Sequence, residues 1–436
     1  MSEVAAAIVF ILGLYTFWMS PARWRPWILI SVSLLVGGLL WQMALATSVC
    51  LIAVHQLMVG RFPHWLISVI LIAPLVAQKA FDLRIVGLSY ATFLILGLHF
   101  DSKRENFDPG PAGRFAFGLF FPIIPVGPIE RWRNLGSQLF SGRPFAKEIF
   151  LSGLLLIAFG IFKKLVIADR LSDLAVDSSK TFLHYSSVDM WFYMGLCLVQ
   201  IYCDFSGVID IARGVSRLFG IEVMDNFDRP YLAESVQDIW RRWHISLVSW
   251  LRDNVYNPIA LRTRSVVAAS GAVLLSVGLW HGVKWQMVVW ALYWLALFWA
   301  AVFLRKRGIR FKLPVWLKRA LCVLAMAFST VFMIPGSLDE LITVLGRTMF
   351  LNSLDPVMYK PLMISLTDAY VVMAGLAIVF VFETYMPALK LKYANAALPE
   401  ISKSVAITTA ALIFTFVYLT VTFGISQWRA FVYLRY

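Results

Sequence analysis

The chain has 436 residues, of which 60% are hydrophobic and 15% are charged, and its mean hydropathy is +0.75. Soluble domains are about 45–50% apolar and about 25% charged, so this composition excludes an ordinary soluble protein and predicts an integral membrane protein. The formal net charge of +14 does not point to nucleic acid, because the basic residues gather between hydrophobic runs, as they do in cytoplasmic loops that face anionic lipid.

Hydrophobic runs are distributed over the whole chain. A helix needs about 20 apolar residues to cross a bilayer, and several runs are shorter, so we expect roughly nine to twelve crossings. The runs do not alternate as the strands of a membrane barrel do, and a helix satisfies its own backbone groups in hydrocarbon. The predicted fold class is therefore an all-α integral membrane protein. The runs lie near 4–19, 26–48, 64–79, 85–99, 115–127, 149–168, 189–212, 265–281, 285–304, 317–335, 363–383 and 405–424.

The first run has neither a cationic leader nor a small-residue cleavage site, which favours a retained helix over a removed signal peptide. We find no Pro-, Gly- or Ser-rich linker and no repeat of fixed period. We therefore predict a single polytopic membrane domain over 1–436. The lack of visible internal symmetry counts mildly against the common transporter architectures.

The cysteines and histidines show no ligand pattern. All four cysteines lie in or beside hydrophobic runs without a CxxC pair, which favours packing over a disulfide framework or a zinc site. The six histidines lack HxxxH or HExxH spacing, so we predict no metal.

The stretch QIYCDFSGVIDIARG, at 200–214, carries Asp204, Asp210 and Arg213 at the end of a hydrophobic run. These groups have two readings. They belong either to a helix that runs out into water or to a polar surface that faces a cavity.

The following segment, 213–264, is rich in Arg, Asp and Trp, yet its pattern is helical. Ser235 is a candidate N-cap with Asp238 three residues later, and Asp238 can reach Arg241 and Arg242 on the next turn. One helical face carries Trp240, His244, Leu247 and Leu251. Pro258 is expected to end this helix.

A helix of about twenty residues with this much charge is not expected to cross lipid freely, so we place it on the cytoplasmic surface or in the floor of the bundle. The simplest alternative is an interfacial anchor, in which Trp and Arg mark the headgroup zone and His244 has no chemical role.

The run 265–281 ends on a histidine, in the sequence GLWHG. If 213–264 and the polybasic segment 305–319 are both cytoplasmic, then 265–304 is a hairpin that crosses out and back. Its first arm would rise about 24 Å against a hydrocarbon core about 30 Å thick, which leaves His281 in the membrane or just below its far face.

A titratable group at that depth indicates a functional site, and a neutral imidazole is a suitable proton acceptor in group transfer. The alternative is a histidine that caps a helix at the interface. Gly278 and Gly282 flank the site and would let a backbone or a substrate approach closely.

Several motifs in one order resemble the membrane-bound O-acyltransferase family (MBOAT), in its bacterial cell-envelope branch. They begin with WRRWHISLVSWLRD followed after about thirty residues by GLWHG, a spacing read directly from the sequence. The others are FFPIIPVGPIERW, GIFKKLVIADRL, YCDFSGVIDIARG, NFDRPYLAESVQDIWRRWH and the chain end FVYLRY, so the resemblance runs from about residue 85 to residue 436.

This resemblance implies a ring of transmembrane helices, with short re-entrant or interfacial helices, around a central tunnel. The donor would enter from the cytoplasm and the acceptor from the other side. By position, His281 is the family's catalytic base and His244 is its second functional histidine. The residues that we assign to substrate binding, within or beside these motifs, are Trp280, Trp243, Arg242, Asp204, Ser206, Asn226 and Arg252. Arg242 or Arg252 would contact donor phosphates, although an ion pair with Asp253 is at least as good an account of Arg252.

Within the branch, GIFKKLVIADRL and WLRDNVYNPI look more like the alginate and peptidoglycan O-acetylation proteins, whereas the length is nearer that of the teichoic-acid D-alanyl exporters. Two stretches depart from the family pattern, NPIALRTR after the arginine–aspartate pair and FMIPGS at 332–337. These departures bear on the acyl group and the acceptor.

We therefore expect an enzyme that moves an acyl group, acetyl by preference, from a cytoplasmic thioester to a hydroxyl of an envelope polysaccharide or a partner protein. D-alanyl transfer, a transporter or flippase, and a structural scaffold are the alternatives. No bound cofactor is expected, since an acyl-coenzyme A or acyl carrier protein is a substrate. The expected setting is a bacterial inner membrane, and the resemblance implies an extracytoplasmic esterase-like partner.

Overall fold

The computed structural model describes residues 2–81, 83, 85–175, 181–309, 311–333, 335–349, 362, 364–394 and 403–425. Over these residues it is built of helices, with an isolated bridge between Phe227 and Trp243 and no named strand. Eight helices of the described chain are long and apolar enough to cross a membrane, and three shorter apolar helices accompany them. The prediction of an all-α integral membrane protein is confirmed.

Contacts between Cα atoms divide the chain into two compact units, each assembled from separate stretches. Unit 1 comprises Met1–Gly160, Val208–Asp225 and Ala388–Phe416, and unit 2 comprises Ile161–Gly207, Asn226–Pro387 and Val417–Tyr436. The prediction of one membrane domain over the whole chain stays a prediction.

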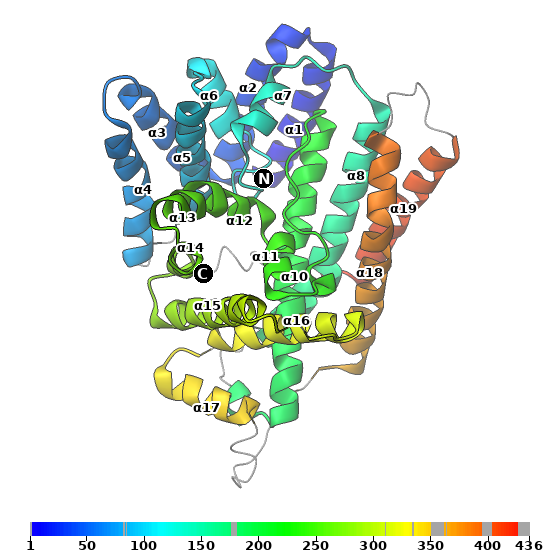
Figure 1. Cartoon of the computed structure of the whole chain (residues 1–436). Helices are drawn as coiled ribbons and strands as arrows, with labels where there is room; N and C mark the ends of the chain where they lie inside the picture. The colour runs from blue at the N-terminus through cyan, green and yellow to red at the C-terminus, as the bar shows by residue number, and fades with distance from the viewer. Residues whose placement is uncertain are drawn as a thin grey trace. The chain divides into compact units, whose positions relative to one another are not determined.

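Unit 1 contains the N-terminal helices. In it α1 packs along α2, and α5 packs against both α3 and α4 (Figure 1). The predicted run 26–48 is two helices, because the helical backbone breaks at Trp41. The helices are α1 (Ser2–Met19), α2 (Arg25–Leu40), α3 (Gln42–Met58), α4 (His64–Ala80), α5 (Leu88–Glu105), α6 (Gly110–Gly118), α7 (Ser137–Leu139) and α8 (Lys147–Phe162), with the C-terminal part of α10 (Ser187–Leu218) and most of α19 (Lys403–Phe423).

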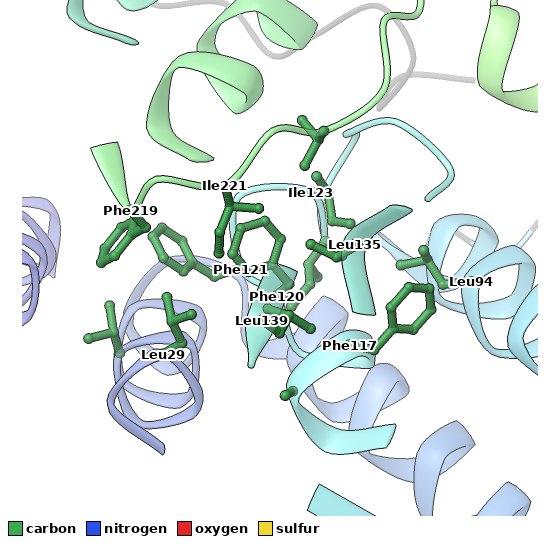
Figure 2. Close-up of a cluster of buried hydrophobic side chains, with 14 of the residues drawn as sticks. Leu29, Leu94, Phe117, Phe120, Phe121, Ile123, Leu135, Leu139, Phe219 and Ile221 are labelled. Atoms are coloured by element: carbon green, nitrogen blue, oxygen red, sulfur yellow. The ribbon is translucent and has the colours of Figure 1, made fainter. Parts of the chain in front are cut away.

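The core of unit 1 surrounds a buried loop. The hydrophobic run 115–127 is one of the shorter runs of the sequence, and in the structure α6 ends at Gly118 and turns follow it. Prolines at 122, 125 and 128 recur every third residue and each removes a helical hydrogen-bond donor, which explains the loop. Phe120 and Phe121 of this loop lie among apolar side chains that include Leu29, Leu139 and Phe219 (Figure 2).

Unit 1 also brings together three histidines that are far apart in the sequence. Nε2 of His55 lies 3.2 Å from Nδ1 of His99, and Nε2 of His99 lies 3.2 Å from Nδ1 of His64. His55 and His99 are buried. The spacing of the histidines in the sequence did not predict this chain of imidazoles, because it forms between three helices. The predicted lack of a metal stays a prediction.

Unit 2 carries GLWHG and residues 226–264 of the segment rich in Arg, Asp and Trp, whereas residues 213–225 of that segment belong to unit 1. The hairpin of α14 and α15 is its most extensive helix pair. The elements are α9 (Asp169–Ala175), the N-terminal part of α10, α11 (Val236–Arg242), α12 (Ile245–Leu251), α13 (Asn257–Thr263), α14 (Val266–His281), α15 (Trp285–Lys306), α16 (Val315–Ser329), α17 (Leu338–Thr348) and most of α18 (Leu366–Ala394), with the short turns η3 (Lys163–Ala168), η4 (Thr181–His184), η5 (Pro230–Leu232), η6 (Arg252–Tyr256) and η7 (Thr330–Phe332).

Candidate active site

The α14–α15 hairpin fixes the position of His281. The Ser265 side chain caps α14 by accepting a hydrogen bond from the backbone N–H of Ala268, and the helix runs to His281, its last residue. A Cβ at Gly278 would lie 2.7 Å from the backbone oxygen of Met287, so α14 approaches α15 closely because residue 278 is glycine. The pairing of α14 and α15 as a hairpin is confirmed, and their close approach explains Gly278, whereas the crossing of this hairpin out and back through the membrane stays a prediction.

Gly282 has no such role in this structure. Its φ of 163° is extended backbone that any residue adopts, and a Cβ there would first meet the Lys284 side chain at 3.9 Å. The expected close approach of another backbone is therefore found at Gly278 and not at Gly282, and the expectation that a substrate approaches closely at these glycines stays a prediction.

Trp280 connects the two predicted histidines. Its ring centroid lies 4.6 Å from that of His281 and 5.7 Å from that of His244. His281 is half-buried and also contacts Trp290, with centroids 5.7 Å apart. The structure thus brings His281, Trp280 and His244 into one site within unit 2.

His244 lies at a break between two helices. Ser235 caps α11 as predicted, since its side chain accepts from the backbone N–H of Asp238, but α11 ends at Arg242. His244 takes a left-handed backbone conformation, with φ and ψ both 49°, and α12 starts after it. The predicted single helix from Ser235 to Pro258 is therefore wrong.

The end of that segment also differs from the prediction. Pro258 lies in the first turn of α13, where its missing N–H is not needed, and the helix continues to Thr263. Pro258 therefore helps to begin a helix, although it was expected to end one.

A strand-like loop before α11 holds the break in place. The backbone N–H of Asp228 donates to the Arg242 oxygen over 3.0 Å, and Phe227 and Trp243 form the isolated bridge. The backbone N–H of Ile245 donates to the Asn226 oxygen over 3.0 Å. These bonds hold His244 against a segment that precedes it by many residues.

Asn226 determines which nitrogen of His244 carries the proton. Its Oδ1 accepts from the backbone N–H of Ser246 at 3.0 Å and from the Ser246 hydroxyl at 2.8 Å. An atom that accepts from a backbone N–H is the amide oxygen, so His244 Nδ1, 3.2 Å away, must be the donor. In the neutral ring Nε2 then carries the lone pair.

His244 is neutral at physiological pH. Its side chain is 3% exposed, and it packs edge-on against Phe205 with centroids 4.9 Å apart. Burial, and secondarily the nearby His281, lower the pKa of His244 to about 3. The ring is therefore able to accept a hydrogen bond at Nε2 but is a weak base.

The predicted donor-binding arginines differ in their surroundings. Arg242 is held internally, with Nε 3.0 Å from Asp238 and Nη1 3.4 Å from Asp228. The predicted Asp238–Arg242 pair is thus confirmed. Arg252 forms the expected alternative, an ion pair of 2.9 Å with Asp253, but its side chain is 59% exposed.

Asp204 and Ser206 lie in a buried network on the N-terminal part of α10. Nζ of Lys164 is 2.6 Å from Asp204 and 2.7 Å from Asp169, and all three side chains are 1% exposed. Nζ of Lys163 donates to the Ser206 hydroxyl over 2.9 Å. Both lysines belong to the π-helical turn η3, an irregularity that is frequent at functional sites.

Sequence reasoning missed the acidic partner of this network. The carboxylate of Glu383 on α18 lies 3.4 Å from Nζ of Lys163 and accepts hydrogen bonds of 2.8 Å from the hydroxyls of Tyr202 and Tyr231. The sequence did contain a signal for it, because Glu383 is a charged residue at the end of the apolar run 363–383, and an ionisable residue in such a run indicates a functional site.

Asp210 and Arg213 lie in unit 1, on the C-terminal part of α10. Arg213 is buried and pairs with Asp210 at 3.7 Å and with Asp225. These residues therefore stabilise the turn after α10.

Residues 88–338, more than half of the chain, match the membrane-bound O-acyltransferase family. The chain belongs to this family. Most of the motifs that carry the resemblance fall in the matched range, whereas FVYLRY lies beyond it and outside the described residues. FMIPGS, which departs from the family pattern, lies within the matched range and is described in part.

Three relatives from this branch are similar to the chain. It is 33% identical to the probable alginate O-acetylase of Azotobacter vinelandii, over 46% of the chain and 41% of that relative. It is 32% identical to the peptidoglycan O-acetyltransferase of Helicobacter pylori, over 39% and 33%. It is 29% identical to the teichoic acid D-alanyltransferase of Bacillus subtilis, over 45% and 54%. The matches thus span between a third and slightly more than half of each relative's length.

Proposed function

We propose that this MBOAT protein transfers an acyl group, acetyl by preference, from a thioester to a hydroxyl group, with His281 as general base. The observation that carries the proposal is the contact of both His281 and His244 with Trp280. Support also comes from the names of the similar O-acetylating relatives.

The chemistry requires one proton acceptor and a stabilised oxyanion. His281, as neutral imidazole, takes the proton of the acceptor hydroxyl, and the oxygen attacks the thioester carbonyl carbon. The carbon–oxygen bond forms, the carbon–sulfur bond breaks, and the thiolate takes the proton from the imidazolium. A thiol leaving group is already activated, so the residues need only to position the reactants, stabilise the oxyanion and move this proton.

His244 has a different role in this scheme. Its low pKa and its Nδ1 bond to Asn226 keep it neutral, with Nε2 as an acceptor. We assign it the positioning of the thioester or of the hydroxyl through that lone pair. Its contact with Trp280 gives the two imidazoles a shared aromatic wall.

The donor and the acceptor follow from the same proposal. A coenzyme A or carrier-protein thioester would approach from the cytoplasm, and the exposed Arg252 is better placed than Arg242 to meet its phosphates. An envelope polysaccharide, reached directly or through an extracytoplasmic esterase-like partner, would take the acyl group. The setting is the bacterial inner membrane.

D-alanyl transfer is the second candidate, because the similar Bacillus subtilis protein carries that name. The donor would then be a D-alanyl carrier-protein thioester, with an ammonium beside the carbonyl. Acyl transfer by the purified protein, measured with an acetyl thioester and then with a D-alanyl thioester, distinguishes acetyl transfer from D-alanyl transfer.

The decisive experiment measures thiol release and acyl transfer in proteoliposomes with acetyl-coenzyme A or acetylated carrier protein. His281→Gln keeps the approximate shape of the ring but cannot act as a base, so we expect the transfer to fall to background. The matched control is His184→Gln, at an exposed histidine of η4. Wild-type transfer by His281→Gln would overturn the proposal, and transport without thiol release would indicate a flippase.

A further inference from the structure

Unit 2 contains an apolar cavity beside the polar network. Its volume is about 260 Å³. Three helices form its walls, α10, α16 and α18, and all three are candidate membrane crossings. Pro230, Tyr231 and Trp243 close one end. A cavity walled by membrane-spanning helices meets hydrocarbon, so its contents must be explained in that solvent.

The walls offer almost no hydrogen-bonding groups. The α16 side is formed by Val323 and Met326, and the α18 side by Leu376, Val379 and Phe380. The polar ends of the lining tyrosines are already used, since the hydroxyls of Tyr202 and Tyr231 both donate to Glu383. Their rings therefore face the cavity as apolar surface.

These walls exclude the polar occupants. Water needs two to four polar partners to stay in a buried site, which these walls do not supply. The amide groups of a pantetheine arm would lose their hydrogen bonds in the same place. An empty cavity of this size would be costly, because the penalty grows with the unfilled volume.

The cavity is continuous with a surface that lipid can reach. Phe380 lines the cavity and is 49% exposed, and on the adjoining faces Leu324 of α16 is 48% exposed and Met373 of α18 is 67% exposed. By contrast Met326 and Val379, deeper in the cavity, are 5% and 2% exposed. A chain that enters beside Phe380 passes from the lipid-facing side to the buried side.

We propose that this cavity binds one hydrocarbon chain of a membrane lipid. The chain enters from the lipid-facing side of α16 and α18 and ends against Trp243 and Tyr231. It fills the volume that the side chains leave and needs no hydrogen bond there. This inference does not depend on the proposed acyl transfer, because neither His281 nor His244 lines the cavity, and Trp243, assigned above to substrate binding, only closes one end of it.

The test uses the full chain in vesicles of phosphatidylethanolamine and phosphatidylglycerol, doped with a phospholipid that carries a diazirine at one acyl terminus. After irradiation, peptide mapping should find label on Val379, which bulk lipid cannot reach. Met326→Trp fills the cavity from the opposite wall and should remove most of that label. The control, Leu324→Trp, adds the same side chain to the lipid-facing side of α16 and should leave the Val379 label unchanged.

Three results would overturn the proposal. In the first, Val379 of the wild-type protein carries no label. In the second, Met326→Trp carries as much label on Val379 as the wild-type protein does. In the third, added octanoyl-pantetheine suppresses the labelling of Val379, whereas added unlabelled phospholipid does not. Thermal midpoints in detergent show whether each variant is folded. If Met326→Trp does not fold, Val323→Phe fills the cavity with a smaller ring, and the same loss of label is expected.

Discussion

Nδ1 of His244 lies 3.2 Å from Oδ1 of Asn226, and this contact sets the tautomer of the buried imidazole. Asn226→Ala removes the acceptor of three buried donors, which are Nδ1–H of His244 and the backbone N–H and the hydroxyl of Ser246. We expect the variant to lose about 2 kcal/mol of stability. We also expect the rate of acyl transfer to fall about tenfold, the equivalent of roughly 1.4 kcal/mol in the barrier. Thermal midpoints and thiol release measure the two effects.

Ser246→Ala is the control for that prediction. It removes one hydrogen bond to Asn226 and keeps the contact between Asn226 and His244. Its transfer rate should stay close to wild type. Equal losses in the two variants would mean that the bond between Asn226 and the Ser246 hydroxyl, and not the contact of Asn226 with His244, accounts for the effect.

The left-handed backbone of His244 makes it possible to test separately its effect on stability and the role of its imidazole in acyl transfer. Asparagine tolerates this conformation, whereas a β-branched residue is strained there by about 1–2 kcal/mol. His244→Asn should therefore melt above His244→Val, while both lose acyl transfer. A His244→Asn variant with wild-type transfer would show that the imidazole is a bystander, as the interfacial-anchor alternative requires.

Protonation of His244 should make stability depend on pH. Its pKa is about 3 in the folded protein against an ordinary value of 6.5, so the unfolded chain binds more protons between these values. The folded state is then destabilised as pH falls through this window, by at most about 1.4 kcal/mol per pH unit. The midpoint of wild type should drop more between pH 7.5 and pH 5 than that of His244→Asn. If the thermal midpoints of the two proteins fell equally with pH, the lowered pKa of His244 would be contradicted.

Local sequence patterns predicted the local features of this region. The Ser235 cap and the Asp238–Arg242 pair depend on residues within one turn, and both are present. The break at His244 depends on Asn226 and on the pairing of Phe227 with Trp243, which lie far apart in the sequence. Helical periodicity contains no information about such pairings, so the single predicted helix was wrong.

Predictions from hydropathy and charge show the same difference between features set by neighbouring residues and features set by contacts between distant segments. Hydropathy identified most helices but also marked 115–127 as a hydrophobic run, because it ignores the prolines at 122, 125 and 128 that prevent a helix from continuing there. Asp204 and Ser206 were assigned to substrate binding from their motif, and that remains a prediction. Their neighbours Lys163, Lys164 and Glu383 meet only when α10, η3 and α18 pack together.

The buried Lys164 should be essential for stability. Lys164→Met leaves the carboxylates of Asp169 and Asp204 buried without this cation, at a cost of about 3–5 kcal/mol. Adding Asp204→Asn should recover part of the loss, because an amide is cheaper to bury than a carboxylate. The control Lys306→Met, at an exposed position of α15, should shift stability by less than about 0.5 kcal/mol. A Lys164→Met protein as stable as wild type would refute a structural role for the network.

The two glycines of GLWHG should differ sharply in their response to alanine. A Cβ at residue 278 would lie 2.7 Å from the Met287 oxygen, so Gly278→Ala must push α14 away from α15. Because His281 is only three residues further along the helix, we expect the shift to misplace its ring. A displacement near 1 Å can cost roughly a hundredfold in rate.

Gly282→Ala adds the same methyl group one residue beyond His281, where the nearest atom would be 3.9 Å away and the backbone is already extended. Its transfer rate and thermal midpoint should match wild type. Thiol release by the two variants, compared at equal amounts of folded protein, measures the difference. If Gly278→Ala were as active as Gly282→Ala, the close approach of α14 to α15 would not be what positions His281, and another contact, such as that with Trp290, would have to hold the ring.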